Sequence, residues 1–96
     1  MIDLGKIVEF EWDKGNLDKS YKKHGITLQE AEELFLDQRI LLLEDIKHSQ
    51  KEKRYNAIGK ITNKILFAVF IIRNNKIRII SIRIASQKER KLYEKI

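Results

Sequence analysis

Hydrophobic positions in the first third of the chain follow a helical period after one short strand. The loosely alternating residues 7–12 (IVEFEW) predict an edge strand. In residues 12–24, Leu17 and Tyr21 lie one turn apart and indicate the buried side of a helix. Gly25 follows, where the left-handed C-cap of that helix is expected.

A second helix is predicted by a capping box and by the residues after it. Thr27 and Glu30 have the spacing of the N-cap and the third helical residue, which hydrogen-bond each other's backbone. The apolar residues that share one face of this helix are Leu28, Ala31, Leu34 and Phe35. The chain therefore begins with two short helices joined near Gly25.

From residue 39 onward the apolar residues form short runs that are typical of strands. The expected strands are 39–43, 55–61, 65–72 and 77–85, with turn residues at 62–63 and 74–75. The run 65–72 is apolar throughout, which predicts burial on both faces. Ser86 and Glu89 form a second capping box and predict a terminal helix.

This order of elements predicts an α+β fold. It consists of two N-terminal helices, a mostly antiparallel sheet of about four to five strands with its helices on one side, and a C-terminal helix. The 96 residues suffice for a single domain, residues 1–96.

The last expected strand carries two polar residues among isoleucines, in the stretch RIISIRIASQKER. Strict alternation would place Ile80, Ile82 and Ile84 on one face together with Arg78. The opposite face would then carry Ile77, Ile79, Ser81 and Arg83. We expect Ser81 and Arg83 to line the floor of a partly open concavity.

Charge is distributed unevenly along the chain and changes what the fold is expected to bind. The net charge of +6 divides into 7 Lys plus Arg against 11 Asp plus Glu up to His48 and 13 against 3 from Ser49 onward. A half with a net charge of +10 favours a polyanion such as nucleic acid as a partner. The alternative is a soluble domain whose surface charges happen to segregate.

Other compositional features narrow the setting. The chain has no cysteine, so disulfides are excluded and a reducing cytoplasm is suitable. We expect no signal peptide and no membrane span, because no apolar run approaches about 18 residues. His24 and His48 have no metal-binding spacing, and no phosphate-binding loop or nucleophile elbow occurs.

The remaining chemistry is that of cations and hydroxyls, which can cut RNA without a metal or cofactor. The RNA's 2′-OH attacks the adjacent phosphate, and the protein supplies proton transfer and positive charge. The candidate residues are Lys23, His24, Arg54, Tyr55, Arg78, Arg83, Lys88, Arg90 and Tyr93. Each has an alternative: Arg83 can pair with a carboxylate, Tyr93 can be a packing residue, and His24 can simply end a helix.

Two separated motifs resemble the BrnT family of type II toxin–antitoxin toxins. They are FEWDKGNLDKSYKKHGITLQEAEELF, residues 10–35, and RIISIRIASQKERKLYEK, residues 78–95; the middle segment KEKRYNAIGKI is also similar. The resemblance implies a small ribonuclease with a RelE-like fold, neutralised by an antitoxin that also binds operator DNA. Carried over by motif, it points to Lys23, His24, Arg54, Tyr55, Arg83 and Tyr93. The chain departs from the family pattern at Asn16, Ser20, Lys53 and Ile82.

The leading hypothesis is a metal-independent endoribonuclease toxin that needs no cofactor. Arg83 would stabilise the scissile phosphate with help from Arg54, and His24 or Tyr93 would transfer protons. The expected RNA contacts are Lys23, Tyr55, Arg78, Lys88 and Arg90. The expected partners are RNA, an antitoxin encoded nearby and, through it, operator DNA.

Two other readings remain open. The same basic face could bind an acidic partner protein or nucleic acid without cutting anything. The chain could also be an RNA-binding regulator, for which binding would fall with salt and no turnover would be seen.

Overall fold

The computed structural model describes residues 9–12, 23, 25–48 and 51–95. The elements in chain order are β1 (Glu9–Trp12), α2 (Leu28–Leu34), β2 (Leu41–Glu44), the 3-10 helix η2 (Ile46–His48), β3 (Tyr55–Lys60), β4 (Ile65–Arg73), β5 (Lys76–Ile84) and α3 (Gln87–Glu94). The α+β class and all five expected strands are confirmed. The first expected helix, residues 12–24, lies almost entirely outside the described residues.

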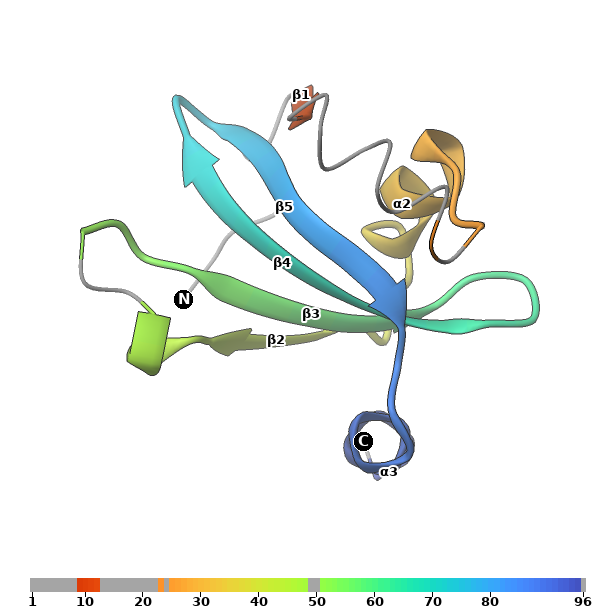
Figure 1. Cartoon of the computed structure of the whole chain (residues 1–96). Helices are drawn as coiled ribbons and strands as arrows, with labels where there is room; N and C mark the ends of the chain where they lie inside the picture. Colours follow the sequence, from red (N-terminus) through yellow and green to blue (C-terminus); the bar gives the residue numbers. More distant parts are fainter. Residues whose placement is uncertain (1–8, 13–22, 24, 49–50, 96) are drawn as a thin grey trace.

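The strands form one mixed sheet in the order β1-β5-β4-β3-β2 (Figure 1). The three pairings among β2, β3, β4 and β5 are antiparallel, as their hairpin connections require. β1 instead runs parallel to β5. These two strands are far apart in the sequence, so no tight turn fixes their relative direction.

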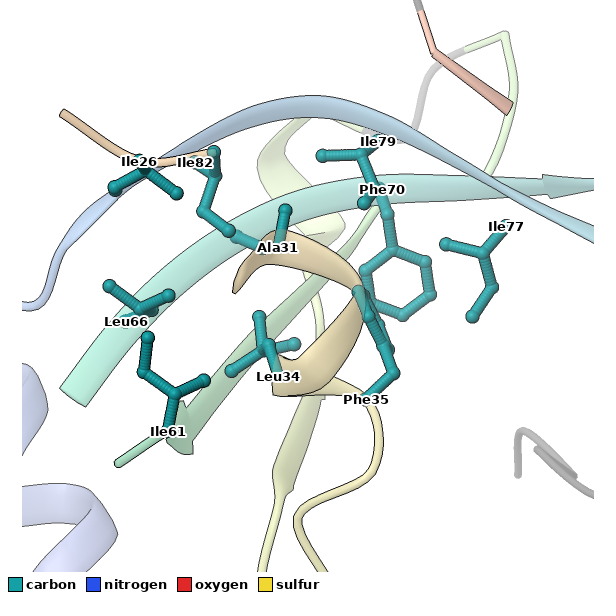
Figure 2. Close-up of a cluster of buried hydrophobic side chains, with 12 residues drawn as sticks. Ile26, Ala31, Leu34, Phe35, Ile61, Leu66, Phe70, Ile77, Ile79 and Ile82 are labelled. Atoms are coloured by element: carbon teal, nitrogen blue, oxygen red, sulfur yellow. The ribbon is translucent and has the colours of Figure 1, made fainter. Parts of the chain in front are cut away.

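One face of the sheet, the core face, packs against α2 (Figures 1 and 2). Helix α2 contributes Ala31 and Leu34, both with no exposed surface. The sheet contributes Leu66, Ala68 and Phe70 from β4 and further residues from β3 and β5. Phe70 meets the ring of Phe35, just beyond α2, edge-on at 5.1 Å between centroids. This cluster is the hydrophobic core of the described structure.

The opposite face, here called the second face, is only partly buried. Alternation along β4 places Phe67 and Val69 there, and both are half-buried rather than fully buried. The prediction that 65–72 is buried on both faces is therefore wrong for this part of β4. Helix α3 lies on this side of the sheet (Figure 1), so the expectation that the helices share one side is wrong as well.

A β-bulge in β5 overturns the strict alternation expected for that strand. Val69 pairs with Ser81 and Phe70 pairs with Ile79, which leaves Ile80 as an extra residue. Ile77, Ile79 and Ile82 consequently all point into the core (Figure 2). Arg78 lies on the second face with Ser81 and Arg83, not with the core isoleucines.

Both predicted capping boxes are present. The Thr27 hydroxyl accepts from the Glu30 backbone and Glu30 accepts from the Thr27 backbone, and Ser86 and Glu89 do the same for α3. Gly25 has the expected left-handed conformation, with φ of +66°. Within the described ranges, no helix is both long and apolar enough to cross a membrane.

Candidate functional site

Arg83 lies near the C-terminal end of β5 on the second face and is held from two directions. Its NH1 and NH2 donate to the two carboxylate oxygens of Glu89 at 2.7 and 2.8 Å. Its guanidinium lies over the ring of Phe67, 4.3 Å from the centroid, which favours a cation–π contact. The side chain remains 41% exposed. Arg83 is thus oriented by its neighbours and still reaches solvent.

Glu89 links this arginine to the start of α3. The same carboxylate accepts from the Ser86 backbone at 2.7 Å, which completes the capping box. Burial alone would raise the pKa of Glu89, but the hydrogen bonds from Arg83 and Ser86 hold that pKa below its usual value. The hydrogen bonds that Arg83 donates to Glu89 in turn raise the pKa of Arg83. One carboxylate therefore both caps the helix and orients the arginine.

Tyr93, on α3, donates from its hydroxyl to Asp37 Oδ2 at 2.6 Å. Asp37 also accepts from the backbone N–H of Lys60 at 2.7 Å and of Arg39 at 3.0 Å. Burial and the bond to Asp37 raise the pKa of Tyr93. Burial alone would raise the pKa of Asp37, but the hydrogen bonds from Lys60, Tyr93 and Arg39 lower it. Tyr93 consequently joins α3 to the segment that follows α2.

A second group of cations lies on the second face near the opposite end of β5. Arg73 donates from Nε and NH2 to the carboxylate of Glu52 at 2.9 and 2.8 Å. The pKa of Glu52 is lowered, first by this bond and then by the charges of Arg73, Arg78 and Arg54. We call Arg54, Arg73 and Arg78, gathered around Glu52, the arginine cluster. The structure thereby brings predicted residues Arg54 and Arg78 together and adds Arg73.

A polar groove lies between α3 and the β3–β4 hairpin. Its two adjoining hollows share Lys60, Thr62, Ile65 and Glu94. One hollow continues to Asp37, Arg39 and Tyr93, and the other to Lys64 and Arg90. The groove places the predicted residue Arg90 beside cations that the sequence did not single out.

The other predicted residues are more dispersed. Tyr55 lies on the core face, where its ring stacks on Phe70 with 5.6 Å between centroids. Lys88 is exposed on α3, and Lys23 is exposed. His24 lies outside the described residues. No group of three or more potential metal-ligating side chains converges in the part of the chain that the structure describes.

Sequence reasoning missed Arg73, Glu52, Glu89 as a partner of Arg83, and Asp37. Arg73 had a usable signal, because it directly precedes the Asn74-Asn75 turn and must lie beside Lys76 across the hairpin. Asp37 had none: its contact with Tyr93 spans 56 positions of sequence.

A sequence profile described as "Ribonuclease toxin, BrnT, of type II toxin-antitoxin system" matches residues 12–89. The match begins in β1, ends at Glu89 and includes Arg54, Arg73, Arg78 and Arg83. No match was found among curated individual proteins. Because the profile covers well over half of the chain, the protein belongs to the BrnT family of ribonuclease toxins of type II toxin–antitoxin systems.

Proposed function

We propose that the chain is an endoribonuclease toxin that cleaves RNA without a metal ion. The observation that carries this proposal is the placement of Arg83 within the matched region, oriented by Glu89 and Phe67 and exposed on the second face. A guanidinium is suited to phosphate because its planar fork can hold two oxygens at once.

In the proposed reaction, the RNA's 2′-oxygen attacks the adjacent phosphorus and loses its proton to a base. The bond from phosphorus to the 5′-oxygen breaks, and an acid protonates that leaving oxygen. The products are a 2′,3′-cyclic phosphate and a 5′-hydroxyl. Negative charge grows on the non-bridging oxygens, and preorganised positive charge is the largest contribution a protein can make there.

Arg83 is assigned this charge-stabilising role. Its bonds to Glu89 and to the Ile84 carbonyl use three N–H hydrogens of the five that a guanidinium carries. The other two are the ones that we assign to phosphate oxygens. Arg54 is assigned a supporting contact, and Arg78, Lys88, Arg90 and Lys23 are assigned contacts along the RNA.

Proton transfer is assigned to His24 on the basis of its residue type and its position in the sequence motif. Tyr93 was the other candidate, and its hydroxyl is bound to Asp37 with a raised pKa. We therefore assign Tyr93 the role of holding α3 in place. Tyr55 is likewise assigned to packing, because its ring stacks on Phe70.

The test is cleavage of purified RNA in excess EDTA by the wild type, Arg83→Ala and Glu89→Gln. Glutamine still accepts the Ser86 bond but carries no charge, so Arg83 is released toward phosphate. We expect the wild type to cut, Arg83→Ala to lose at least about 100-fold in rate, as for other transition-state donors, and Glu89→Gln to retain activity.

Thermal unfolding of each variant separates this outcome from a structural one. If Arg83 only anchors α3, both substitutions reduce activity in parallel with stability. Intact RNA with wild-type protein, or cleavage unchanged by Arg83→Ala, contradicts the mechanism.

The second candidate function is a basic module that binds an acidic partner or nucleic acid without cutting it. The engagement of Arg83 with Glu89 and of Tyr93 with Asp37 supports this alternative, because two catalytic candidates already have protein partners. Expression of the chain alone in bacteria distinguishes the two. Growth arrest that Arg83→Ala removes favours the enzyme, and harmless expression favours the binding module.

Membership of a type II system implies an antitoxin, and we propose that it is encoded next to this chain and acts with it in the cytoplasm. Its acidic segments would meet the basic second half of the chain, and the complex would bind operator DNA. Co-expression of the neighbouring small open reading frame should relieve the arrest and yield a co-purifying complex.

A further inference from the structure

The arginine cluster is built by three features of the local fold. Asn74 and Asn75 have φ of +51° and +61°, the left-handed values of a tight two-residue turn between β4 and β5. This turn pairs Arg73 with Lys76 and Ile71 with Arg78. Paired residues share a face, so Arg73 and Arg78 lie diagonally across the hairpin on the second face. Arg54 directly precedes β3, and its charge acts on Glu52.

The bond between Arg73 and Glu52 has the geometry that an arginine uses for phosphate. Two parallel N–H groups, Nε and NH2, meet two oxygens of one anion. The side chains of Arg73 and Glu52 are 51% and 36% exposed, so water and dissolved anions reach the pair. An exposed pair of this kind contributes little to the stability of a fold.

The cluster places three arginines around one carboxylate, Glu52, and further carboxylates lie beside it. Arg78 lies 3.7 Å from Glu11, which also bonds Lys76, and Lys76 bonds Glu9. Lys76 and the three arginines therefore lie among Glu9, Glu11 and Glu52 along this end of the second face. Movement of Glu52 away from Arg73 would leave a guanidinium fork directed at solvent beside two more arginines.

The cluster also shares a surface with Arg83. Arg78 and Arg83 are five residues apart on β5, which is about 16 Å at strand spacing. The bulge at Ile80 puts both on the second face. A single strand of RNA held at Arg83 would extend several nucleotides along this face before reaching the cluster.

From this geometry we infer that Arg73, with Arg54 and Arg78, is a binding site for a backbone phosphate of single-stranded RNA, and that Glu52 occupies the phosphate position in the free protein. The inference rests on the proposed function for its ligand, RNA. Glu52 acts as a competing internal anion that RNA must displace, which lowers affinity for RNA in general.

The test uses a fluorescent single-stranded RNA with 2′-O-methyl groups throughout, which no 2′-oxygen attack can cut. Its dissociation constant is measured by anisotropy for the wild type, Arg73→Ala, Glu52→Gln and Lys91→Ala. Lys91 is an exposed lysine of α3 outside the cluster and controls for the loss of one charge.

We expect Arg73→Ala to weaken binding by about 10-fold, as the loss of one charge-assisted pair does. Glu52→Gln should tighten binding several-fold, and Lys91→Ala should change it by less than about 2-fold. Opposite signs of the first two effects, together with a much smaller effect of Lys91→Ala, support the site, because loss of a positive charge elsewhere on the surface then changes binding little. A purely structural ion pair makes both variants weaker or leaves both unchanged. Either of those results overturns the inference.

This experiment is independent of cleavage. If the wild type fails to cut ordinary RNA in EDTA but the signs above are found, the phosphate site stands and the proposed enzymatic function fails. Circular dichroism of each variant at the assay temperature verifies that the fold is retained. Arg73→Lys is a further check: it keeps the charge but loses the fork, so it should recover only part of the affinity.

Discussion

At Gly59 the sheet lies in close contact with the helix that covers it. A Cβ atom at this position would lie 2.6 Å from Leu34 Cδ1 and 3.3 Å from both the Leu34 carbonyl oxygen and Asp37 Oδ2. Leu34 is completely buried, so it has little space into which to move. The glycine of the KEKRYNAIGKI motif is therefore explained by packing rather than by chemistry.

Gly59→Ala should accordingly destabilise the protein by about 1–3 kcal/mol, the usual result of overpacking a core. For a domain of this size, each kcal/mol lowers the melting temperature by about 4–8 °C. Differential scanning calorimetry measures the change.

The matched comparison is Gly25, whose substitution is strained by its φ of +66°. Among the residues that the structure describes, apart from the chain neighbours of Gly25, none has an atom within 4 Å of an added Cβ. Asparagine tolerates left-handed backbone, so Gly25→Asn should be milder than Gly25→Ala. At Gly59 the larger asparagine should be worse than alanine. The same order at both positions would contradict the packing explanation.

Asp37→Asn should destabilise the fold by about 1–3 kcal/mol at pH 7, because an amide has one acceptor oxygen for the three donors that now bond the carboxylate. The pKa of Asp37 is lowered in the folded protein, so its stabilising effect is present above the unfolded pKa of about 3.9 and is lost as the pH falls through the folded value.

The stability difference between the wild type and Asp37→Asn should therefore shrink as the pH drops below about 4. Urea unfolding at a series of pH values measures it. A difference that stays constant to acid pH would show that the carboxylate's charge has no part in the effect.

Among the elements, the starts of the helices and the positions of the strands could be predicted from the sequence. Which residues of β5 face the core could not. Capping boxes are local, so Thr27 with Glu30 and Ser86 with Glu89 can be recognised from four residues each. The bulge at Ile80 depends on how β5 meets β4, which is a tertiary matter. Strict alternation in the sequence therefore placed Arg78 on the wrong face of the sheet.

The candidate site shows the same division. Motif and charge singled out Arg54, Arg78 and Arg83, but nothing local revealed that Arg83 bonds Glu89 or that Tyr93 bonds Asp37. The first bond spans 6 positions and the second 56. Contacts of this kind follow from the packing of α3, which the sequence places only as the last helix.

Helix α3 is attached by polar contacts more than by apolar ones. None of its residues is fully buried, and its bonds to the rest of the fold include those of Glu89 and Tyr93. Ser86→Ala removes the N-cap acceptor and should cost about 1 kcal/mol. Because the backbone N–H of Glu89 would lose the Ser86 hydroxyl as its acceptor, we also expect faster amide exchange in α3.

Hydrogen exchange followed by mass spectrometry measures this, with Thr27→Ala as the matched control. That substitution removes the equivalent cap of α2, whose Ala31 and Leu34 are buried in the core. It should leave exchange in α3 unchanged. Equal exchange in α3 for both variants would refute the local role of Ser86.

In the whole molecule, the charge asymmetry of the sequence leads to separate basic sites on the surface. Several cations of the basic half lie at three places, which are the Arg83 site, the arginine cluster and the groove beside α3. Several carboxylates, including Glu9, Glu11 and Glu30, pair with these cations across the sheet or along its edge. The net charge near each place is therefore much smaller than +10.

RNA binding should accordingly show a modest dependence on salt. A single strand that displaced counterions at four phosphates would give a slope of log affinity against log salt of about −3, since each contributes about 0.7. Anisotropy titrations at salt concentrations from about 50 mM to about 200 mM measure this slope. A slope near zero would exclude the second face as a phosphate-binding surface.

The single extra residue at Ile80 decides what β5 displays. In an uninterrupted strand, positions 78 and 83 have opposite parity, and no amount of surface mutation could make them neighbours on one side. The extra residue at the bulge puts positions 78 and 83 on the same face. The strand can therefore place isoleucines in the core on both sides of the bulge while both arginines point outward. Deleting Ile80 would restore regular pairing and leave Arg78 and Arg83 an even number of residues apart, so both guanidinium groups should stay outward. Adding a residue between them while the bulge is kept would instead turn one of them toward the hydrophobic cluster.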